Sequence, residues 1–229
     1  MSAAIRIISS MATRALLEEL AAACRRATGQ ELSVESVGGV DAARRVQAGE
    51  AFDLVALAAD AIDRLSEGGS IVPGSRIDLV SSGVAVAVRV GAQRPDIGTE
   101  EALRRLVVEA PSIGLSTGPS GVQLARLFER WGIASAIADR LVQAPPGVPV
   151  GALLARGEVE LGFQQLSELM HLPGIEVLGP LPAAVQITTI FSVGLATAST
   201  QPELARAVLE YLASPATANA KRRHGMEPV

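Results

Sequence analysis

Short apolar runs alternate with amphipathic segments along this chain. The first example begins with the apolar run 5–8, continues through a turn rich in hydroxyl groups, residues 9–13, and enters a helical pattern. The apolar face of that helix is made by Leu16, Leu17, Leu20 and Cys24. Gly29 is expected to end the helix, because glycine adopts the left-handed conformation that commonly follows a last turn. The pattern therefore predicts a strand, a turn and a helix.

The same alternation continues to the end of the chain. Further strands are predicted over residues 31–37, 53–57, 84–90, 160–164 and 187–197. Further helices are predicted over residues 42–48, 59–67, 102–109, 134–141, 150–156, 203–213 and 215–224. Strands that alternate with helices imply α/β lobes, each a mostly parallel sheet flanked by helices. We interpret 84–90 and 187–197 as two crossover strands, which gives lobe 1 as 1–83 plus 191–229 and lobe 2 as 84–190.

The segment Ser112 to Gly132 carries the clearest candidate for a binding site. An apolar run, residues 113–115, stops at Ser116-Thr117-Gly118-Pro119-Ser120-Gly121, and an amphipathic helical pattern starts at Val122. The first N–H groups of a helix are unpaired and carry partial positive charge, so small and hydroxyl residues placed there can hold an anion. An ordinary N-capped turn is the alternative interpretation.

Two other turns share this construction, and their repetition favours anion binding. One is the hydroxyl turn 9–13, and the other is the glycine pair that follows strand 31–37. Gln164 and Gln165 come at the end of another predicted strand, where ligands of open α/β sheets collect. The rigid turn 145–149 either connects two elements or forms a wall of the same cleft. The residues expected to contact the ligand are Ser9, Ser10, Met11, Gly38, Gly39, Val40, Ser116, Ser120, Gly121, Val122, Val148, Gln164 and Gln165.

Composition narrows the possible partners. Apolar residues make up 48% of the chain and aromatic residues only 3%, which fits a compact core and argues against a base-stacking nucleic-acid surface. The net charge of -4 gives no long-range attraction to nucleic acid or to anionic membranes, and no apolar run is long enough to span a bilayer. Cys24 is the one cysteine of the chain, so an internal disulfide is excluded. Lys221 is the one lysine among 20 basic residues.

No signal peptide pattern precedes the first predicted strand. A cytoplasmic location is therefore expected, or a periplasmic one if a leader has been removed. A permease of the ABC type is an expected partner only in the second case.

Several of these motifs resemble the molybdate-binding branch of the type II periplasmic binding proteins, over nearly the whole chain. The matching segments are Ile8-Ser9-Ser10-Met11, Ala51-Phe52-Asp53-Leu54-Val55, Ala58-Ala59-Asp60, Gly118-Pro119-Ser120-Gly121 and Gly151-Ala152-Leu153. Two positions depart from the family. Val37-Gly38-Gly39-Val40 stands where the family has a second Ser-rich turn, and Gln164-Gln165 replaces a strand-end Tyr. The resemblance implies a two-lobed fold that binds a small anion in an interlobe cleft.

The two departures favour a larger, carboxylate-bearing ligand over a small tetrahedral oxyanion. The loss of the Ser turn opens space, and an amide replaces a hydroxyl. Either Arg14 or Arg44 could complete a carboxylate site through bidentate contacts, and an exposed helix Arg is the alternative for each.

Two functions of different classes fit these expectations. One is a solute-binding module without covalent chemistry. The other is an isomerase of an unsaturated polycarboxylate, because relatives of the type II binding proteins include an aconitate isomerase. Such an enzyme needs a base near a carbon acid and donors for the developing enolate. Glu168 is a weakly supported base, His171 and His224 are expected to be ordinary surface residues, and no metal or cofactor motif is present.

Overall fold

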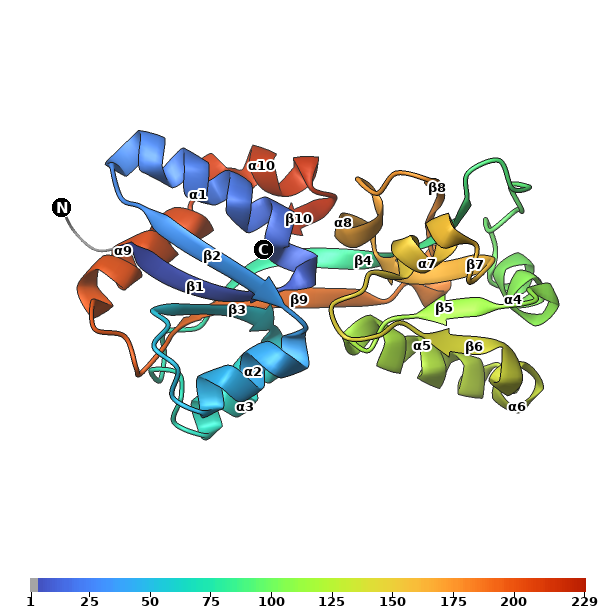
Figure 1. Cartoon of the computed structure of the whole chain (residues 1–229), viewed down its shortest axis with the longest axis horizontal. Helices are drawn as coiled ribbons and strands as arrows, with labels where there is room; N and C mark the ends of the chain where they lie inside the picture. Colours follow the sequence, from blue (N-terminus) through green and yellow to red (C-terminus); the bar gives the residue numbers. More distant parts are fainter. Residues whose placement is uncertain (1–3) are drawn as a thin grey trace. The chain divides into compact units, whose positions relative to one another are not determined.

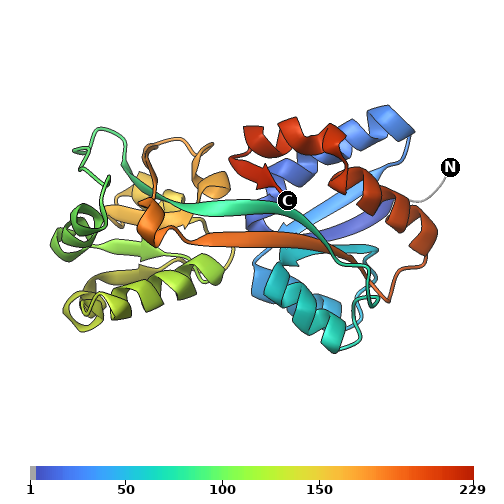
Figure 2. The ribbon, with the colours of Figure 1, turned by 180° about the vertical axis from the view of Figure 1, so that it is seen from behind.

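The computed structural model describes residues 4–229, and their contacts divide the chain into two compact units. Unit 1 contains the described part of residues 1–81 together with 190–229, and unit 2 contains residues 82–189. The boundaries lie beside the lobe limits expected from the sequence, at 83/84 and 190/191. Strands β4 (Ile77–Arg89) and β9 (Thr188–Leu195) each continue from one unit into the other (Figure 2).

Unit 1 is a sheet with helices on both faces. Its other strands are β1 (Ile5–Ser10), β2 (Leu32–Val37), β3 (Leu54–Ala58) and β10 (Met226–Pro228). Its helices are the 3-10 turn η1 (Met11–Thr13), α1 (Arg14–Thr28), α2 (Gly39–Gln47), α3 (Ala59–Glu67), α9 (Pro202–Ala213), the 3-10 turn η4 (Pro215–Thr217) and α10 (Ala218–Arg223). The strand order is β2-β1-β3-β9, and β10 pairs with β4. β1 is parallel to β2 and β3, whereas β9 is antiparallel to β3.

Each face of this sheet has its own apolar core. α1, α9 and α10 cover one face and α2 and α3 cover the other (Figure 1). Leu16, Leu20 and Leu209 belong to the first core, and Phe52 and Ile62 belong to the second. The apolar periodicity of the helices therefore matches the faces that they bury.

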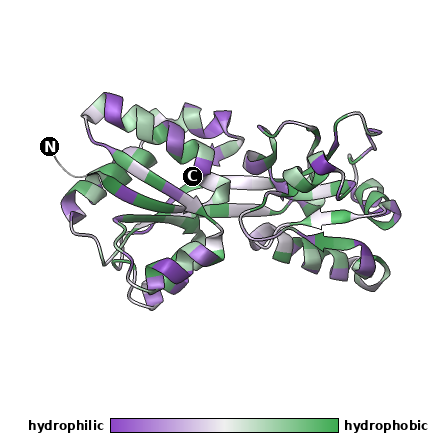
Figure 3. Ribbon diagram, in the orientation of Figure 1, coloured by the Kyte–Doolittle hydropathy of each residue, from purple (hydrophilic) through white to green (hydrophobic). Residues whose placement is uncertain are grey.

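Unit 2 has the same layered construction. In addition to β4, its strands are β5 (Ile113–Leu115), β6 (Leu141–Gln143), β7 (Leu161–Gln165) and β8 (Ile175–Pro180). Its helices are α4 (Glu100–Glu109), α5 (Pro119–Arg130), α6 (Ala134–Ile137), the 3-10 turn η2 (Ala138–Arg140), α7 (Val150–Arg156), α8 (Leu166–Leu169) and the 3-10 turn η3 (Ala183–Val185). The strand order is β4-β7-β5-β6, with β8 paired to β4. The strands of both units are mostly hydrophobic, whereas the helices also carry hydrophilic residues (Figure 3).

The predicted α/β class is confirmed, but the sheets are mixed rather than mostly parallel. In unit 2, β5 is parallel to β6 and β7, while β4 is antiparallel to both β7 and β8. The predicted helix over 59–67 is confirmed, and Gly29 ends α1 with a φ of 76°. Thr99 caps α4 by accepting a hydrogen bond from the backbone N–H of Ala102.

Several predicted boundaries are wrong. β4 begins at Ile77, seven residues before the predicted start, and the predicted helix 134–141 breaks up into α6, η2 and the first residue of β6. α2 and α5 each begin three residues earlier than predicted, at Gly39 and Pro119. The short elements β6, α8, β8 and β10 were not predicted. None of the helices in the described residues is both long and apolar enough to cross a membrane.

Candidate functional site

In unit 1, the polar residues at the end of β1 lie beside the start of α2. Ser10 is in register with Val37, and a methyl group added at Gly39 would lie 3.9 Å from Ser10 Cβ. Gly38 is the N-cap of α2 and provides no side-chain cap, so the first N–H groups of this helix are not satisfied by a capping side chain. The structure thus brings Ser10, Gly38 and Gly39 together.

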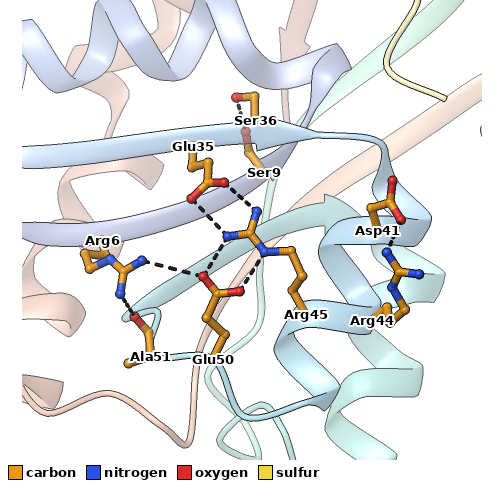
Figure 4. Close-up of polar contacts among 9 residues, drawn as sticks. All are labelled: Arg6, Ser9, Glu35, Ser36, Asp41, Arg44, Arg45, Glu50 and Ala51. Carbon is orange, nitrogen blue, oxygen red and sulfur yellow. Dashed lines mark hydrogen bonds and ion pairs between the residues drawn. The ribbon is translucent and has the colours of Figure 1, made fainter.

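The two serines of β1 differ in what remains available for a ligand. Ser9 is fully buried and shares a 2.7 Å hydrogen bond with Ser36 Oγ (Figure 4). Ser10 Oγ is buried and has no hydrogen-bond partner. A buried hydroxyl without a partner marks a place where a ligand or a water molecule can bond. Ser10, rather than Ser9, is the available donor, while Met11 is half-buried and Val40 is 75% exposed.

Both arginines proposed for a carboxylate site already form an ion pair with a carboxylate on their own helix. Arg14 is exposed and pairs with Glu18 one turn along α1, at 2.9 Å. Arg44 is exposed and pairs with Asp41 at 2.7 Å (Figure 4). The alternative interpretation, an exposed arginine on a helix, therefore describes both Arg14 and Arg44.

A denser ionic network lies next to Arg44 along the same helix. Arg45 contacts both Glu35 and Glu50 (Figure 4). Its guanidinium also lies 5.2 Å from the centre of the Phe52 ring. The pKa values of Glu35 and Glu50 are lowered, first of all by their hydrogen bonds to Arg45. Because these groups satisfy one another, the network joins β2 to α2 and leaves none of its charges for a ligand.

In unit 2, the start of α5 is a tight turn. Ser116 Oγ and Ser120 Oγ lie 3.0 Å apart, and a methyl group added at Gly121 would lie 1.9 Å from the carbonyl oxygen of Ser116. The backbone N–H of Gly121 donates to Gly118 O at 3.1 Å, and that of Val122 donates to the same oxygen at 3.3 Å. The Gly121 amide, an expected ligand contact, therefore already has an acceptor within the turn. Ser120 is buried in the turn, where its hydroxyl contacts Ser116 Oγ. Val122 is 52% exposed.

The end of β7 holds the most organised polar cluster of unit 2. Gln164 Oε1 accepts a 2.7 Å hydrogen bond from the backbone N–H of Val150, the first residue of α7, and its Nε2 donates to Glu168 Oε1, also at 2.7 Å. Gly114 and Gly162 allow α7 to come this close, because a methyl group at either would collide with Val150. Gln164 was predicted to contact the ligand directly, but both ends of its amide already have partners. Val148 is half-buried, and its N–H donates to Pro145 O.

Gln165 is only partly satisfied. Its Nε2 donates to Thr189 Oγ1 at 2.8 Å, while its buried Oε1 has no partner. Ser167 Oγ, beside it in sequence, is also buried without a partner, as is Ser82 Oγ. Ser82 lies two residues from Val84, which pairs with Gln165. A buried oxygen without a partner can bond to a water molecule or to a ligand, so the end of β7 is a candidate binding position.

Glu168 is the titratable group of this cluster. Burial raises its pKa to about 7, against the opposing effect of the hydrogen bond from Gln164. A carboxyl group with a pKa near neutrality can both accept and return a proton at physiological pH. Ser82, Ser167 and Thr189 were missed in the sequence analysis, where the only signal was a polar interruption of apolar runs.

The raised pKa predicts a pH-dependent stability difference between the wild type and E168Q. Between the ordinary pKa of 4.5 and about 7, the unfolded chain has lost the Glu168 proton and the folded chain keeps it. The free energy of unfolding of the wild type therefore falls as pH rises through this window, by on the order of 3 kcal/mol at most, and that of E168Q lacks this contribution. Urea denaturation at pH 5 and pH 8 should show the variant gaining on the wild type. A difference that does not change with pH would contradict the raised pKa.

The histidines and the cysteine have different environments. His171 is exposed, as expected. The expectation that His224 is an ordinary surface residue is wrong, because its side chain is largely buried and its Nε2 lies 2.8 Å from Glu19 Oε2. Cys24 is buried in the α1 core, as predicted. No group of three or more metal-binding side chains occurs within residues 4–229.

Comparison with known proteins places these features in context. The family model described as bacterial extracellular solute-binding protein matches residues 5–227. A Pseudomonas sp. protein named aconitate isomerase is 38% identical over 98% of this chain and 88% of its own length. The periplasmic molybdate-binding protein of Azotobacter vinelandii superposes with a TM-score of 0.82 at 16% identity, covering 97% of this chain and 98% of its own. PEB3 of Campylobacter jejuni, in complex with L-phospholactate, gives a TM-score of 0.77 at 13% identity, covering 98% of this chain and 100% of its own.

Proposed function

Because this chain belongs to the bacterial extracellular solute-binding protein family, we propose that it binds a small carboxylate anion and isomerises it by proton transfer. The observation that carries the proposal is the near full-length, 38% identity to a protein named aconitate isomerase. The substrate class is accordingly an unsaturated polycarboxylate. The solved structures are too distant in sequence to support more than the fold.

Glu168 is the proposed base. In its ionised form it removes a proton from a carbon next to the C=C bond, and the electron pair of the broken C–H bond forms the new double bond as the old one shifts. Glu168 then returns the proton to the far carbon, so that no oxidant or co-reactant is needed. A base with a pKa of about 7 suits both halves of this exchange.

Uncharged donors stabilise the negative charge that develops on the carboxylate next to the reacting carbon. Within unit 2, which also holds Glu168, the proposed donor is the Ser120 hydroxyl. Within unit 1, the candidate donors are Ser10 Oγ and the unsatisfied start of α2. Gln164 does not touch the ligand in this proposal. It holds the Glu168 carboxyl in place, because its Oε1 is fixed by Val150 N–H and its Nε2 must then face Glu168.

A second candidate function is ligand binding without chemistry, as a solute-binding module. It is favoured by the match of residues 5–227 to the bacterial extracellular solute-binding protein family, and by the neutral character of the predicted donors. Both functions use the same polar groups, so binding alone does not separate them.

The experiment follows the fate of the ligand. We expect cis- and trans-aconitate to bind, to interconvert by ultraviolet absorbance, and to exchange carbon-bound hydrogen with D2O by proton NMR. The saturated analogue tricarballylate should bind unchanged. Aconitate that raises the Tm but neither exchanges nor isomerises would favour the solute-binding module. A large Tm increase with molybdate and none with carboxylates would overturn the ligand class.

A further inference from the structure

Unit 2 has a groove whose residues the proposed function does not use. The groove has a volume of about 480 Å³. One wall comes from α5 and the other from residues 184–188, which run from η3 into the start of β9. All of the lining residues belong to unit 2, and none of them is Ser120, Gln164 or Glu168. We call this site the α5 groove.

The wall from α5 is cationic. Arg126 and Arg130 lie one helical turn apart, and both line the groove. Like charges at this spacing repel each other. Among residues 4–229, no carboxylate lines the groove, and no hydrogen bond or ion pair involves the guanidinium of Arg126. Arg130 Nη2 is 3.7 Å from Glu100 Oε1, but that oxygen already accepts a 2.5 Å hydrogen bond from Trp131 Nε1.

The opposite wall adds a neutral donor that is held in place. Gln186 Oε1 accepts a 2.9 Å hydrogen bond from the backbone N–H of Ile187. Gln186 Nε2 has no acceptor within the described residues and lies over Gly83, where an added methyl group would be 2.8 Å away. The backbone here is anchored as well, because the N–H of Val84 donates to Ile187 O at 2.9 Å. The amide is therefore positioned before any ligand binds.

Much of the remaining lining is apolar. Leu127 and Val185 are buried in the unit 2 core, and Ile187 packs against the same core. Guanidinium groups bind the paired oxygens of carboxylates and phosphates. Apolar side chains beside such donors contact the carbon skeleton of a ligand, as in other small-molecule sites. The lining thus suits an organic anion better than a bare inorganic ion.

We propose that the α5 groove binds a small organic anion with two negative charges, carried by carboxylate or phosphate groups. Arg126 and Arg130 bind the charged oxygens, and Gln186 donates an additional hydrogen bond. The bound anion neutralises the two arginines that otherwise repel each other. This site is separate from the proposed site of proton transfer and does not depend on it.

The first test follows the Ile187 δ1-methyl resonance in protein with 13C-labelled isoleucine methyl groups, assigned with the I187V variant. Succinate and glycerol 2-phosphate are the probes for the two kinds of charged group. We expect a saturable shift, which glycerol or sodium chloride at equal ionic strength does not produce. Saturation by one probe alone supports the site and identifies the group that it takes. A resonance that responds to neither anion, or equally to sodium chloride, would overturn the proposal.

The second test compares R126Q with R105Q. Arg105 is exposed on α4 of the same unit, has no ion pair within the described residues and does not line the groove. We expect R126Q to weaken binding of the probe by about 10-fold or more, because a charge-assisted contact is lost. R105Q should bind within about twofold of the wild type, since a remote exposed charge contributes little. Equal affinities of the two variants would show that Arg126 is not a ligand contact and would overturn the proposal.

The outcome for aconitate is independent of these results. R126Q should interconvert cis- and trans-aconitate at the wild-type rate, because Arg126 is outside the proposed site of proton transfer. A wild type that saturates at Ile187 but does not isomerise aconitate would contradict the proposed function and support the α5 groove. A wild type that isomerises aconitate without any response at Ile187 would do the reverse.

Discussion

Replacement of Glu168 by glutamine is expected to slow hydrogen exchange at the ligand carbon by about 10²–10⁴-fold, while the affinity for tricarballylate stays within about threefold. The amide is nearly isosteric with the carboxyl group and can still accept the hydrogen bond from Gln164 Nε2, which is 2.7 Å in the wild type. It cannot accept a proton from carbon. Single-turnover NMR in D2O measures the rate, and calorimetry measures the affinity.

The matched control for this variant is Glu160→Gln. Glu160 is exposed and precedes β7, the strand that Glu168 follows, so the change removes one carboxylate from the same part of unit 2. The control should exchange at the wild-type rate. The wild-type rate should also rise with pH through about 7, because only the ionised Glu168 is a base. An E168Q protein that exchanges as fast as the control would show that another group is the base.

Gln164 holds the Glu168 carboxyl in place, which distinguishes Glu168 from a carboxylate on the surface. The amide joins the first turn of α7 to α8 through two 2.7 Å hydrogen bonds, and the glycines of β5 and β7 permit that approach. The hydrogen bond from Gln164 Nε2 thereby holds the carboxyl of Glu168 in one orientation. Fixed orientation is what a proton transfer to and from carbon requires.

Helices with a clear apolar periodicity and a glycine after the last turn could be predicted from the sequence. α1 and α3 follow from apolar periodicity and from glycines after their last turns. The first half of β4 was missed because Ser81, Ser82 and Gly83 interrupt its apolar pattern. This part of the strand is specified by distant partners instead: Asp78 accepts from Ser192 of β9 at 2.6 Å. Short strands such as β6 and β8 likewise depend on neighbours that are far away in the sequence.

The turns that carry the candidate donors could be predicted from the sequence, but the availability of those donors could not. Small and hydroxyl residues after strands predicted the turns at Ser10 and Ser120. Whether a donor is free depends on tertiary contacts: Ser9 is engaged by Ser36, and Gln164 by Val150 and Glu168. Contacts seen in the structure also decide whether an arginine side chain is available to a ligand. The helical position of Arg44 beside the turn could be predicted, but its ion pair with Asp41 could not.

Replacement of Gly121 by alanine is expected to destabilise the protein by about 3 kcal/mol and to lower its Tm by on the order of 10 °C. The added methyl group would lie 1.9 Å from Ser116 O and 3.0 Å from Ser116 C, which are backbone atoms and cannot rotate away. The turn must therefore open, and the 3.0 Å contact between Ser116 Oγ and Ser120 Oγ must lengthen. Ligand affinity should fall as well, because Ser120 is displaced from the start of α5. Thermal unfolding and calorimetry measure the two effects.

Gly118→Ala is the matched control, three residues away in the same turn. Its methyl group would meet Ser116 Oγ at 3.7 Å, an ordinary contact, and its φ of -81° is available to alanine. The expected cost is less than about 1 kcal/mol, from the poorer N-cap. If Gly121→Ala is as stable as this control, the close approach of α5 to Ser116 is not required for the turn. If it is less stable but binds the ligand with full affinity, Ser120 is not among the donors.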